Sequence, residues 1–135
     1  MNYQDIRWKQ RLDSLSKAMV LLNEAAEIEA PSQVEQMGLI QTFEVCYELG
    51  WKLLQDYLKH LGHNPKSPRE TIKQAYQDGL ITDGDTWLRM TQTRNLTTHT
   101  YDRAMVLSTE ETIKEHYLSL LNELHDDFHR RADAD

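Results

Sequence analysis

Apolar residues recur along most of the chain with the three- and four-residue spacing of amphipathic helices. The first such stripe predicts a helix over about residues 3–29, before Pro31; its members are Trp8, Leu12, Leu15, Met19, Leu22 and Ala26. The next stripe predicts a helix over about 33–61 with an apolar face wide enough for neighbours on two sides; it comprises Ile40, Phe43, Tyr47, Leu54, Leu58 and Leu61. Gly62 and the Asn64-Pro65 pair are typical of a helix end.

Helix-start signals divide the second half of the chain. Ser67 as N-cap, Pro68 at the first helical position and Glu70 in a capping box predict a third helix over about 68–78. Thr82 or Asp83 is expected to cap a fourth helix that ends near residue 95. A final helix is expected from Asp102 to about residue 131, with Ser108 as an alternative start. We therefore expect an all-α, single-domain antiparallel bundle of about five helices over residues 1–135, with a charged, frayed tail from about 130.

Composition narrows the function classes. The net charge of −7 and only 15 Lys and Arg against 22 Asp and Glu do not suit a protein that holds nucleic acid by its overall field. RNA chemistry would need a local cationic pocket or a basic partner. The longest aliphatic run is too short to span a bilayer, and the first residues lack the apolar stretch of a secretory signal. With Cys46 as its lone cysteine, the chain is expected to be cytoplasmic.

The stretch "RNLTTHTYD", residues 94–102, interrupts the helical pattern. Its three threonines, at positions 97, 98 and 100, are β-branched and poor helix formers. On an unbroken helix Arg94 and Tyr101 would share a face, whereas His99 would point about 140° away from Arg94. The three side chains can therefore converge only if the helix breaks near the threonines, or if a second copy of the chain supplies one of them.

These residue types suit phosphodiester cleavage without a metal. Histidine is the side chain that most often exchanges protons in catalysis, so His99 can act as general base or acid, while Arg94 can stabilise the charge that develops on phosphorus. Tyr101 can orient a phosphate or accept a transferred group, with Asn95 and Asp102 as possible supporting residues. The structural alternative is that His99 and Tyr101 cap carbonyls or fill a seam between helices, and that Arg94 pairs with Asp102.

Other candidate sites are weaker. His125 and His129 have the i, i+4 spacing of two metal ligands on one helix face, beside Asp126 and Asp127, but no third ligand is evident nearby. The chain also has neither a glycine-rich phosphate loop nor the G-S-x-D motif of nucleotidyltransferases. We expect no metal and no cofactor, and no nucleotide transfer by this chain itself.

Arg94-x4-His99-x-Tyr101 matches the R-x4-H-x-Y motif of the HEPN superfamily. Three further stretches, "FEVCYELGWKLLQDYL" (43–58), "SPRETIKQAYQDGLI" (67–81) and "WLRMTQTRNLTTHTYD" (87–102), resemble one branch of it in order. These are the HepT-like proteins, also labelled nucleotidyltransferase substrate-binding proteins. The resemblance covers roughly residues 35–125, and so is more specific than the motif alone.

The resemblance implies a two-fold homodimer in which two copies of the motif line one cleft. It also implies a metal-independent endoribonuclease toxin of a toxin–antitoxin pair, neutralised by a partner nucleotidyltransferase that adenylylates (AMPylates) the motif tyrosine. Carried onto this chain, Arg94 and His99 are catalytic, and Tyr101 positions RNA and is the adenylylation target. The substrate expected is RNA, either tRNA or mRNA, with no role for DNA or a membrane. The alternative is a non-catalytic substrate-binding subunit of a nucleotidyltransferase complex.

Overall fold

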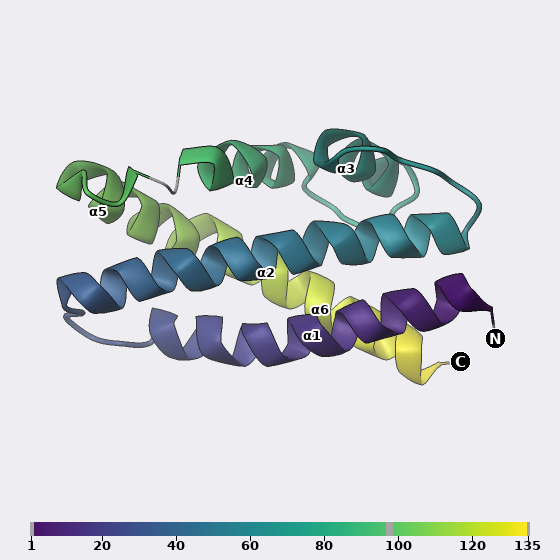
Figure 1. Ribbon diagram of the computed structural model, residues 1–135, viewed down its shortest axis with the longest axis horizontal. Coiled ribbons are helices and arrows are strands. Elements are labelled where there is room, and N and C mark those ends of the chain that lie inside the picture. The colour runs from purple at the N-terminus through teal and green to yellow at the C-terminus, as the bar shows by residue number, and fades with distance from the viewer. Residues whose placement is uncertain (1, 97–98, 135) are drawn as a thin grey trace.

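A computed structural model describes residues 2–96 and 99–134, which are almost entirely helical (Figure 1). The helices are α1 (Tyr3–Ala26), α2 (Gln33–His60), α3 (Pro68–Gln77), α4 (Gly84–Leu96), α5 (Arg103–Thr112) and α6 (Leu118–Asp133), with a π-helical segment, η2 (Ile113–Tyr117), between α5 and α6. No strand occurs among these residues. The all-α prediction is confirmed. No helix in the described ranges is both long and apolar enough to cross a membrane.

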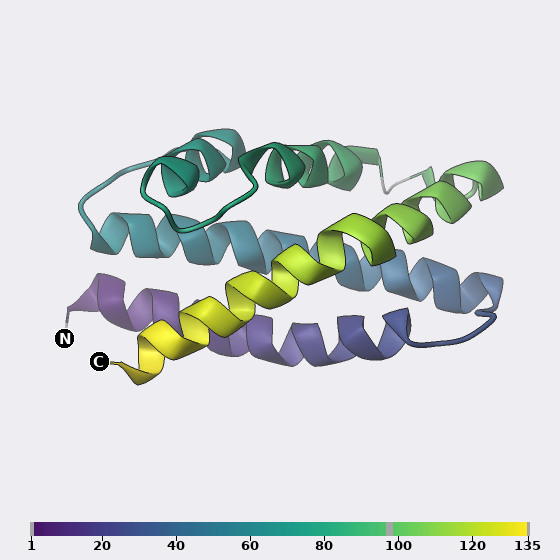
Figure 2. The same cartoon turned by 180° about the vertical axis from the view of Figure 1, so that it is seen from behind.

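The second helix, α2, is the centre of the bundle. It runs antiparallel to α1, carries α3 and α4 on another side, and is crossed by the long α5–η2–α6 rod (Figures 1 and 2). Most of its wide apolar face is buried as predicted, including Phe43, Tyr47 and Leu54, but Leu61, at the C-cap, is exposed. Cys46 is fully buried on the same helix, and burial raises the pKa of its thiol to about 12, so that it stays protonated and unreactive at neutral pH.

Polar caps define the helix starts, with two differences from expectation. Ser67 accepts a hydrogen bond from the amide of Glu70, but the Glu70 carboxylate accepts from the amide of Lys66, so the predicted capping box at α3 does not close on Ser67. A complete capping box instead opens α2, where Ser32 and Glu35 each accept from the other's amide. Polar side chains thus begin both helices without burying unpaired amides.

The last helix begins at its predicted cap but is longer and less regular than expected. The Asp102 carboxylate accepts from the amides of Ala104 and Met105, whereas Ser108, the alternative start, lies inside α5. The rod widens to a π-helix at residues 113–117, which the sequence pattern did not predict. It then continues to Asp133, so the segment expected to fray from about residue 130 is helical to that point.

Asp83 sets the start of α4, the helix that carries Arg94. Its carboxylate accepts from the amide of Thr86 at 3.0 Å and from the Thr86 hydroxyl at 2.7 Å. These two hydrogen bonds lower the pKa of Asp83 below its ordinary value. Because the charged form is favoured in the folded state, Asp83 contributes stability above the unfolded-state pKa of about 4, and the contribution is lost as pH falls through the lower folded-state pKa.

We expect Asp83→Ala to destabilise the protein by about 1 kcal/mol at neutral pH, because a helix N-cap is lost. Asp83→Asn is the matched control, since asparagine also caps but does not titrate. The melting-temperature advantage of the parent over Asp83→Asn should shrink as the pH is lowered from 7 to 3, because Asp83 becomes protonated in the parent. The other carboxyl groups titrate alike in both proteins, so their effect cancels. A pH-independent difference would contradict this account.

Candidate functional site

Two partly buried hydroxyl pairs dock the last turns of α4. The Tyr47 hydroxyl of α2 is hydrogen-bonded to the Thr91 hydroxyl, and burial raises the pKa of Tyr47, so that its phenol stays protonated. Two residues on, the Thr93 hydroxyl lies 2.7 Å from that of Tyr117, the last residue of η2. The Tyr117 ring stacks on Phe43 at a centroid distance of 5.4 Å. The end of α4 is therefore fixed against both α2 and the π-helical segment.

Arg94 follows directly and turns its guanidinium to α2. Its Nη1 lies 3.2 Å from a carboxylate oxygen of Glu44, and its Nε lies 3.4 Å from one of Glu48. The other oxygen of Glu48 accepts from the indole nitrogen of Trp51 at 3.1 Å. Glu44 and Glu48 were not predicted as partners of Arg94. They are one helical turn apart on α2, but nothing in the spacing along the chain indicates that α4 lies beside them.

Helix α4 ends at Leu96, at the start of the threonine-rich stretch that predicted a break in the helix. Two of its threonines, at positions 97 and 98, lie outside the described residues. The following residues form a short turn, in which the amide of Asp102 donates to the carbonyl of His99 at 3.0 Å. Within it, Nδ1 of His99 lies 2.9 Å from the Tyr101 hydroxyl, with the two rings edge to face at 5.7 Å. Tyr101 is 82% exposed, so this pair projects from the bundle.

The two supporting candidates differ from the motif residues in their contacts. Asn95 is exposed on the last turn of α4. Asp102 uses its carboxylate to cap α5, which is a structural task. The alternative in which Arg94 pairs with Asp102 is not what the ion pairs show, because the guanidinium pairs with carboxylates of α2. The pair of His99 and Tyr101 is likewise not buried in a seam between helices.

The family described as "Nucleotidyltransferase substrate binding protein like" matches residues 10–130, nearly the whole chain and all of the motif. The chain belongs to this family. That membership confirms the HepT-like resemblance drawn from the motif and its flanking stretches.

Two known proteins illustrate what this chain is similar to. A Haemophilus influenzae protein named "Probable ribonuclease HepT" is 32% identical over 76 residues, which are 53% of this chain and 52% of the relative. The chain thus spans about half the length of that curated relative in the match. A crystal structure of a protein from Thermus thermophilus superposes with a TM-score of 0.77 at 34% identity, covering 82% of this chain and 94% of the other.

The geometry of this family member offers two kinds of chemistry at the turn. A neutral His99 with an unprotonated Nδ1 can take a proton from the Tyr101 hydroxyl or from another hydroxyl brought to the same place. The guanidinium of Arg94, which lies against α2, can bind a phosphate through two parallel hydrogen bonds. Arg94 is only partly exposed and held by two carboxylates, so a phosphate must compete with these carboxylates for it.

The histidines at positions 125 and 129 have other partners. His125 lies 2.8 Å from the Ser16 hydroxyl through Nε2 and 3.0 Å from Asp126 through Nδ1, while His129 is 3.4 Å from Asp133. Within the described residues no group of three or more potential ligands could hold a metal ion. Ser16 also donates to the carbonyl of Leu12 at 3.0 Å, so its proton is not directed to the imidazole as in a serine nucleophile.

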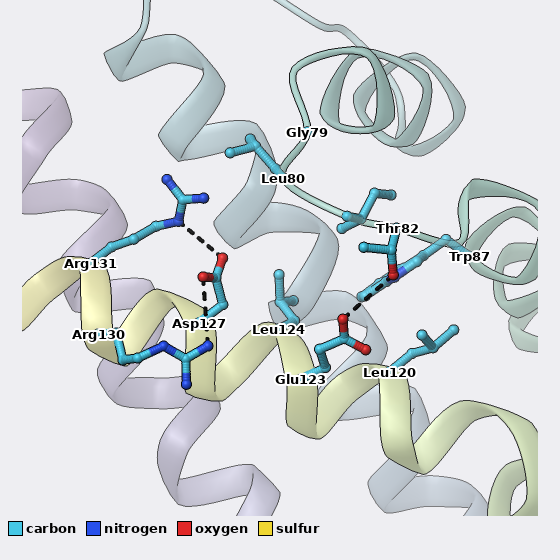
Figure 3. A pocket seen from close by; sticks show the side chains of 11 residues that line it. Gly79, Leu80, Thr82, Trp87, Leu120, Glu123, Leu124, Asp127, Arg130 and Arg131 are labelled. Carbon is cyan, nitrogen blue, oxygen red and sulfur yellow. Dashed lines mark hydrogen bonds and ion pairs between the residues drawn. The ribbon is translucent and has the colours of Figure 1, made fainter.

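A hollow of about 170 Å³ lies between α6 and the segment that joins α3 to α4 (Figure 3). Arg130 and Arg131 both turn toward Asp127, at 3.8 and 3.0 Å, and Thr82 donates to Glu123 at 3.4 Å. Two arginines and two carboxylates give its lining a formal charge of zero. It contains none of the motif residues, and its neutral, internally paired walls do not favour a phosphate.

We expect Tyr101→Phe to change the free energy of unfolding by less than about 0.5 kcal/mol, because the side chain is exposed. The matched variant Tyr117→Phe removes a buried hydroxyl bonded to Thr93 and should cost about 1–3 kcal/mol. Urea unfolding followed by circular dichroism measures both. Equal destabilisation by the two variants would show that Tyr101 is part of the folded core.

Proposed function

We propose that this chain is a metal-independent endoribonuclease that acts as a cytoplasmic homodimer, with Arg94 and His99 as catalytic residues. A partner nucleotidyltransferase neutralises it by adenylylating Tyr101. The observation that carries the proposal is the 2.9 Å contact between His99 and Tyr101 on an exposed turn, five residues after Arg94 in the chain. Family membership and the name of the H. influenzae relative support it.

The proposed reaction uses the 2′-hydroxyl of RNA as its nucleophile. His99 takes the 2′-hydroxyl proton, and the resulting oxygen forms a bond to the adjacent phosphorus. The bond from phosphorus to the 5′-oxygen of the next nucleotide breaks, and that oxygen takes up a proton. The products are a 2′,3′-cyclic phosphate and a 5′-hydroxyl. Arg94 stabilises the extra negative charge on the phosphoryl oxygens, and Tyr101 donates its hydroxyl to one of them. The substrate lacking a 2′-hydroxyl, DNA, cannot react in this way.

Exposed apolar side chains beside the motif support a dimer on this face. Leu96, at the end of α4, is 53% exposed, and Leu107, on α5, is 46% exposed. They flank the turn that holds His99 and Tyr101 on both sides along the chain. The proposed dimer would bury both side chains, and removing apolar surface from water favours association. A two-fold axis at this face would bring two copies of the motif to one cleft.

The second candidate is a subunit without its own catalysis that presents Tyr101 to the nucleotidyltransferase. The 82% exposure of Tyr101 favours it, because an acceptor must enter another enzyme's active site. His99 would take the phenolic proton as the tyrosine oxygen bonds to the α-phosphorus of a nucleoside triphosphate bound by the partner, and pyrophosphate leaves. An AMP group would add negative charge and bulk where the first candidate binds a phosphate. Both candidate functions therefore use His99 and Tyr101.

We expect the purified protein to cleave tRNA or total cellular RNA in EDTA, and His99→Ala and Arg94→Ala to lower the rate at least about a hundredfold, since each removes a general base or a charge stabiliser. Mass spectrometry must first show that the parent is unmodified, and size-exclusion chromatography that it is dimeric. Lys17→Gln, at an exposed position outside the turn, is the control with one positive charge removed.

Cleavage that stops at a 2′,3′-cyclic phosphate end would identify the reaction. Absence of cleavage by unmodified, dimeric parent protein would reject the ribonuclease and leave the acceptor subunit. Equal cleavage by His99→Ala and the parent would reject His99 as the base.

We expect Tyr101→Phe to abolish transfer of AMP from radiolabelled ATP by the partner nucleotidyltransferase, because no acceptor oxygen remains. Tyr76→Phe is the matched control, since Tyr76 is also exposed, at 56%, but lies on α3 away from the motif. It should be labelled like the parent. Full labelling of Tyr101→Phe would show that the acceptor lies elsewhere.

A further inference from the structure

A cationic hollow lies between the start of α1 and the second half of α2. Its volume is about 420 Å³, and its lining contains Arg7 and Arg11 from α1 and Lys52 and Lys59 from α2, against a single carboxylate, Asp56. The formal charge of the lining is therefore +3, in a chain whose net charge is −7. The hollow in Figure 3 is neutral, and the one between α3 and α4 contains one lysine and two aspartates.

The carboxylate organises the two arginines. Asp56 is only 4% exposed and lies 3.1 Å from Nε of Arg11 and 3.9 Å from Nε of Arg7. Both guanidinium groups engage it through Nε, and Nη1 of Arg7 also reaches the Tyr3 hydroxyl at 3.5 Å. The terminal nitrogens of Arg11 make no ion pair with the described residues. A buried carboxylate thus holds donors in place for a ligand, which lowers the entropy lost on binding.

Lysines of α2 connect this hollow to the candidate site. Glu48, which pairs with Arg94, also lies 3.9 Å from Nζ of Lys52, which lines the hollow. Lys59 stands seven residues further along the same face of α2 and makes no ion pair within the described ranges. At 1.5 Å per residue, Glu48 and Lys59 are roughly 16 Å apart along the helix. In Figure 1, α2 lies between α4, which carries Arg94, and α1, which carries the arginines.

We propose that this hollow binds a backbone phosphate of the RNA strand, some distance from the bond that is cut beside Arg94. The inference rests on the proposed ribonuclease function and adds to it a second contact with the substrate. Guanidinium and ammonium groups are the side chains that hold phosphates, and arginine binds them through two parallel hydrogen bonds. The polar side chain of Gln55, also in the lining, can bond a ribose hydroxyl.

An acidic chain needs such a subsite. Its overall field repels a polyanion, and Arg94 is already paired with two carboxylates. A site with a local charge of +3 supplies the attraction that the motif alone lacks, and it fixes the direction of the strand across α2. A flat acidic protein surface would meet the exposed ends of the lysines but would not fill a concave hollow with arginines at its wall.

The test compares RNA binding by two double variants in the full chain. Both are made with His99→Ala, so that no RNA is cut. Lys52→Gln/Lys59→Gln removes two charges from the hollow, while Lys17→Gln/Lys73→Gln removes two exposed lysines outside it. Fluorescence anisotropy with a labelled single-stranded RNA gives the dissociation constant at several salt concentrations. Neither hollow lysine pairs with the buried Asp56, so the fold should persist, which circular dichroism checks.

We expect the hollow variant to bind RNA about tenfold more weakly at low salt. Its log–log salt slope should be shallower by about 0.7, because the hollow holds one phosphate and each lost phosphate contact on a single strand changes the slope by about 0.7. The control pair should keep the slope of the parent. The double variant Lys52→Arg/Lys59→Arg should restore the salt slope of the parent, because both positive charges are present again.

Equal slopes for the hollow variant and the control pair would overturn the inference, as would absence of RNA binding by the parent. So would a hollow variant that binds RNA normally but fails to bind the nucleotidyltransferase, since the hollow would then be a protein-docking surface. Inorganic phosphate at constant ionic strength should displace little RNA; strong displacement, lost in the hollow variant, would indicate a free-phosphate site instead. If these variants bind RNA as expected but the unmodified parent with His99 intact never cuts it, the ribonuclease is rejected and this binding site still stands.

Discussion

The candidate site depends on the docking of α4 by two tyrosine–threonine pairs. Tyr47 and Tyr117 come from different helices and bond Thr91 and Thr93, which are two residues apart on α4. Because both hydroxyl pairs are largely shielded from water, separating them would leave polar groups without partners, at about 1–3 kcal/mol each. The π-helical turn at residues 113–117 ends on Tyr117, and the extra residue in that turn changes the direction in which its side chain points. The backbone of Arg94 is therefore held in a fixed position, although its guanidinium lies near the surface.

The end of α4 is docked rigidly on the bundle, whereas His99 and Tyr101, which follow it in the chain, are exposed. From His99 to Asp102 the backbone makes a short turn held by the amide of Asp102, whose carboxylate also starts α5. His99 and Tyr101 gain almost no burial there, so their hydrogen bond contributes little to folding. Side chains with no packing task can be altered or modified without unfolding the bundle. This separation of stability from chemistry is what a site needs if its tyrosine is to enter another enzyme's active site.

Local signals predicted most of the fold, because they act over a few residues. The apolar stripes, the Ser67, Asp83 and Asp102 caps and Gly62, which has a positive φ of 99°, gave the helices to within a few residues. Contacts between distant segments were beyond such signals. Arg94 meets Glu44 and Glu48 far back along the chain, and Arg11 meets Asp56 across 45 positions. The π-helical turn also escaped prediction, since its residues have the ordinary helical pattern. The motif could be named from the sequence, but its electrostatic surroundings could not.

Those surroundings explain how an acidic bundle could handle a polyanion selectively. The ion pairs of Arg94 with Glu44 and Glu48 are partly exposed, so each contributes no more than about 1 kcal/mol. A phosphate that a second contact holds beside the guanidinium can replace a carboxylate there at a small cost in free energy. A free anion has no second contact and gains too little binding free energy to do so. The cationic hollow sits on the same helix as these carboxylates and adds binding energy only for a ligand long enough to span both. In the proposed ribonuclease, the carboxylates that weaken Arg94 as an anion site would thus make its occupation depend on strand length. This would couple recognition of a strand to the position of its reacting phosphate.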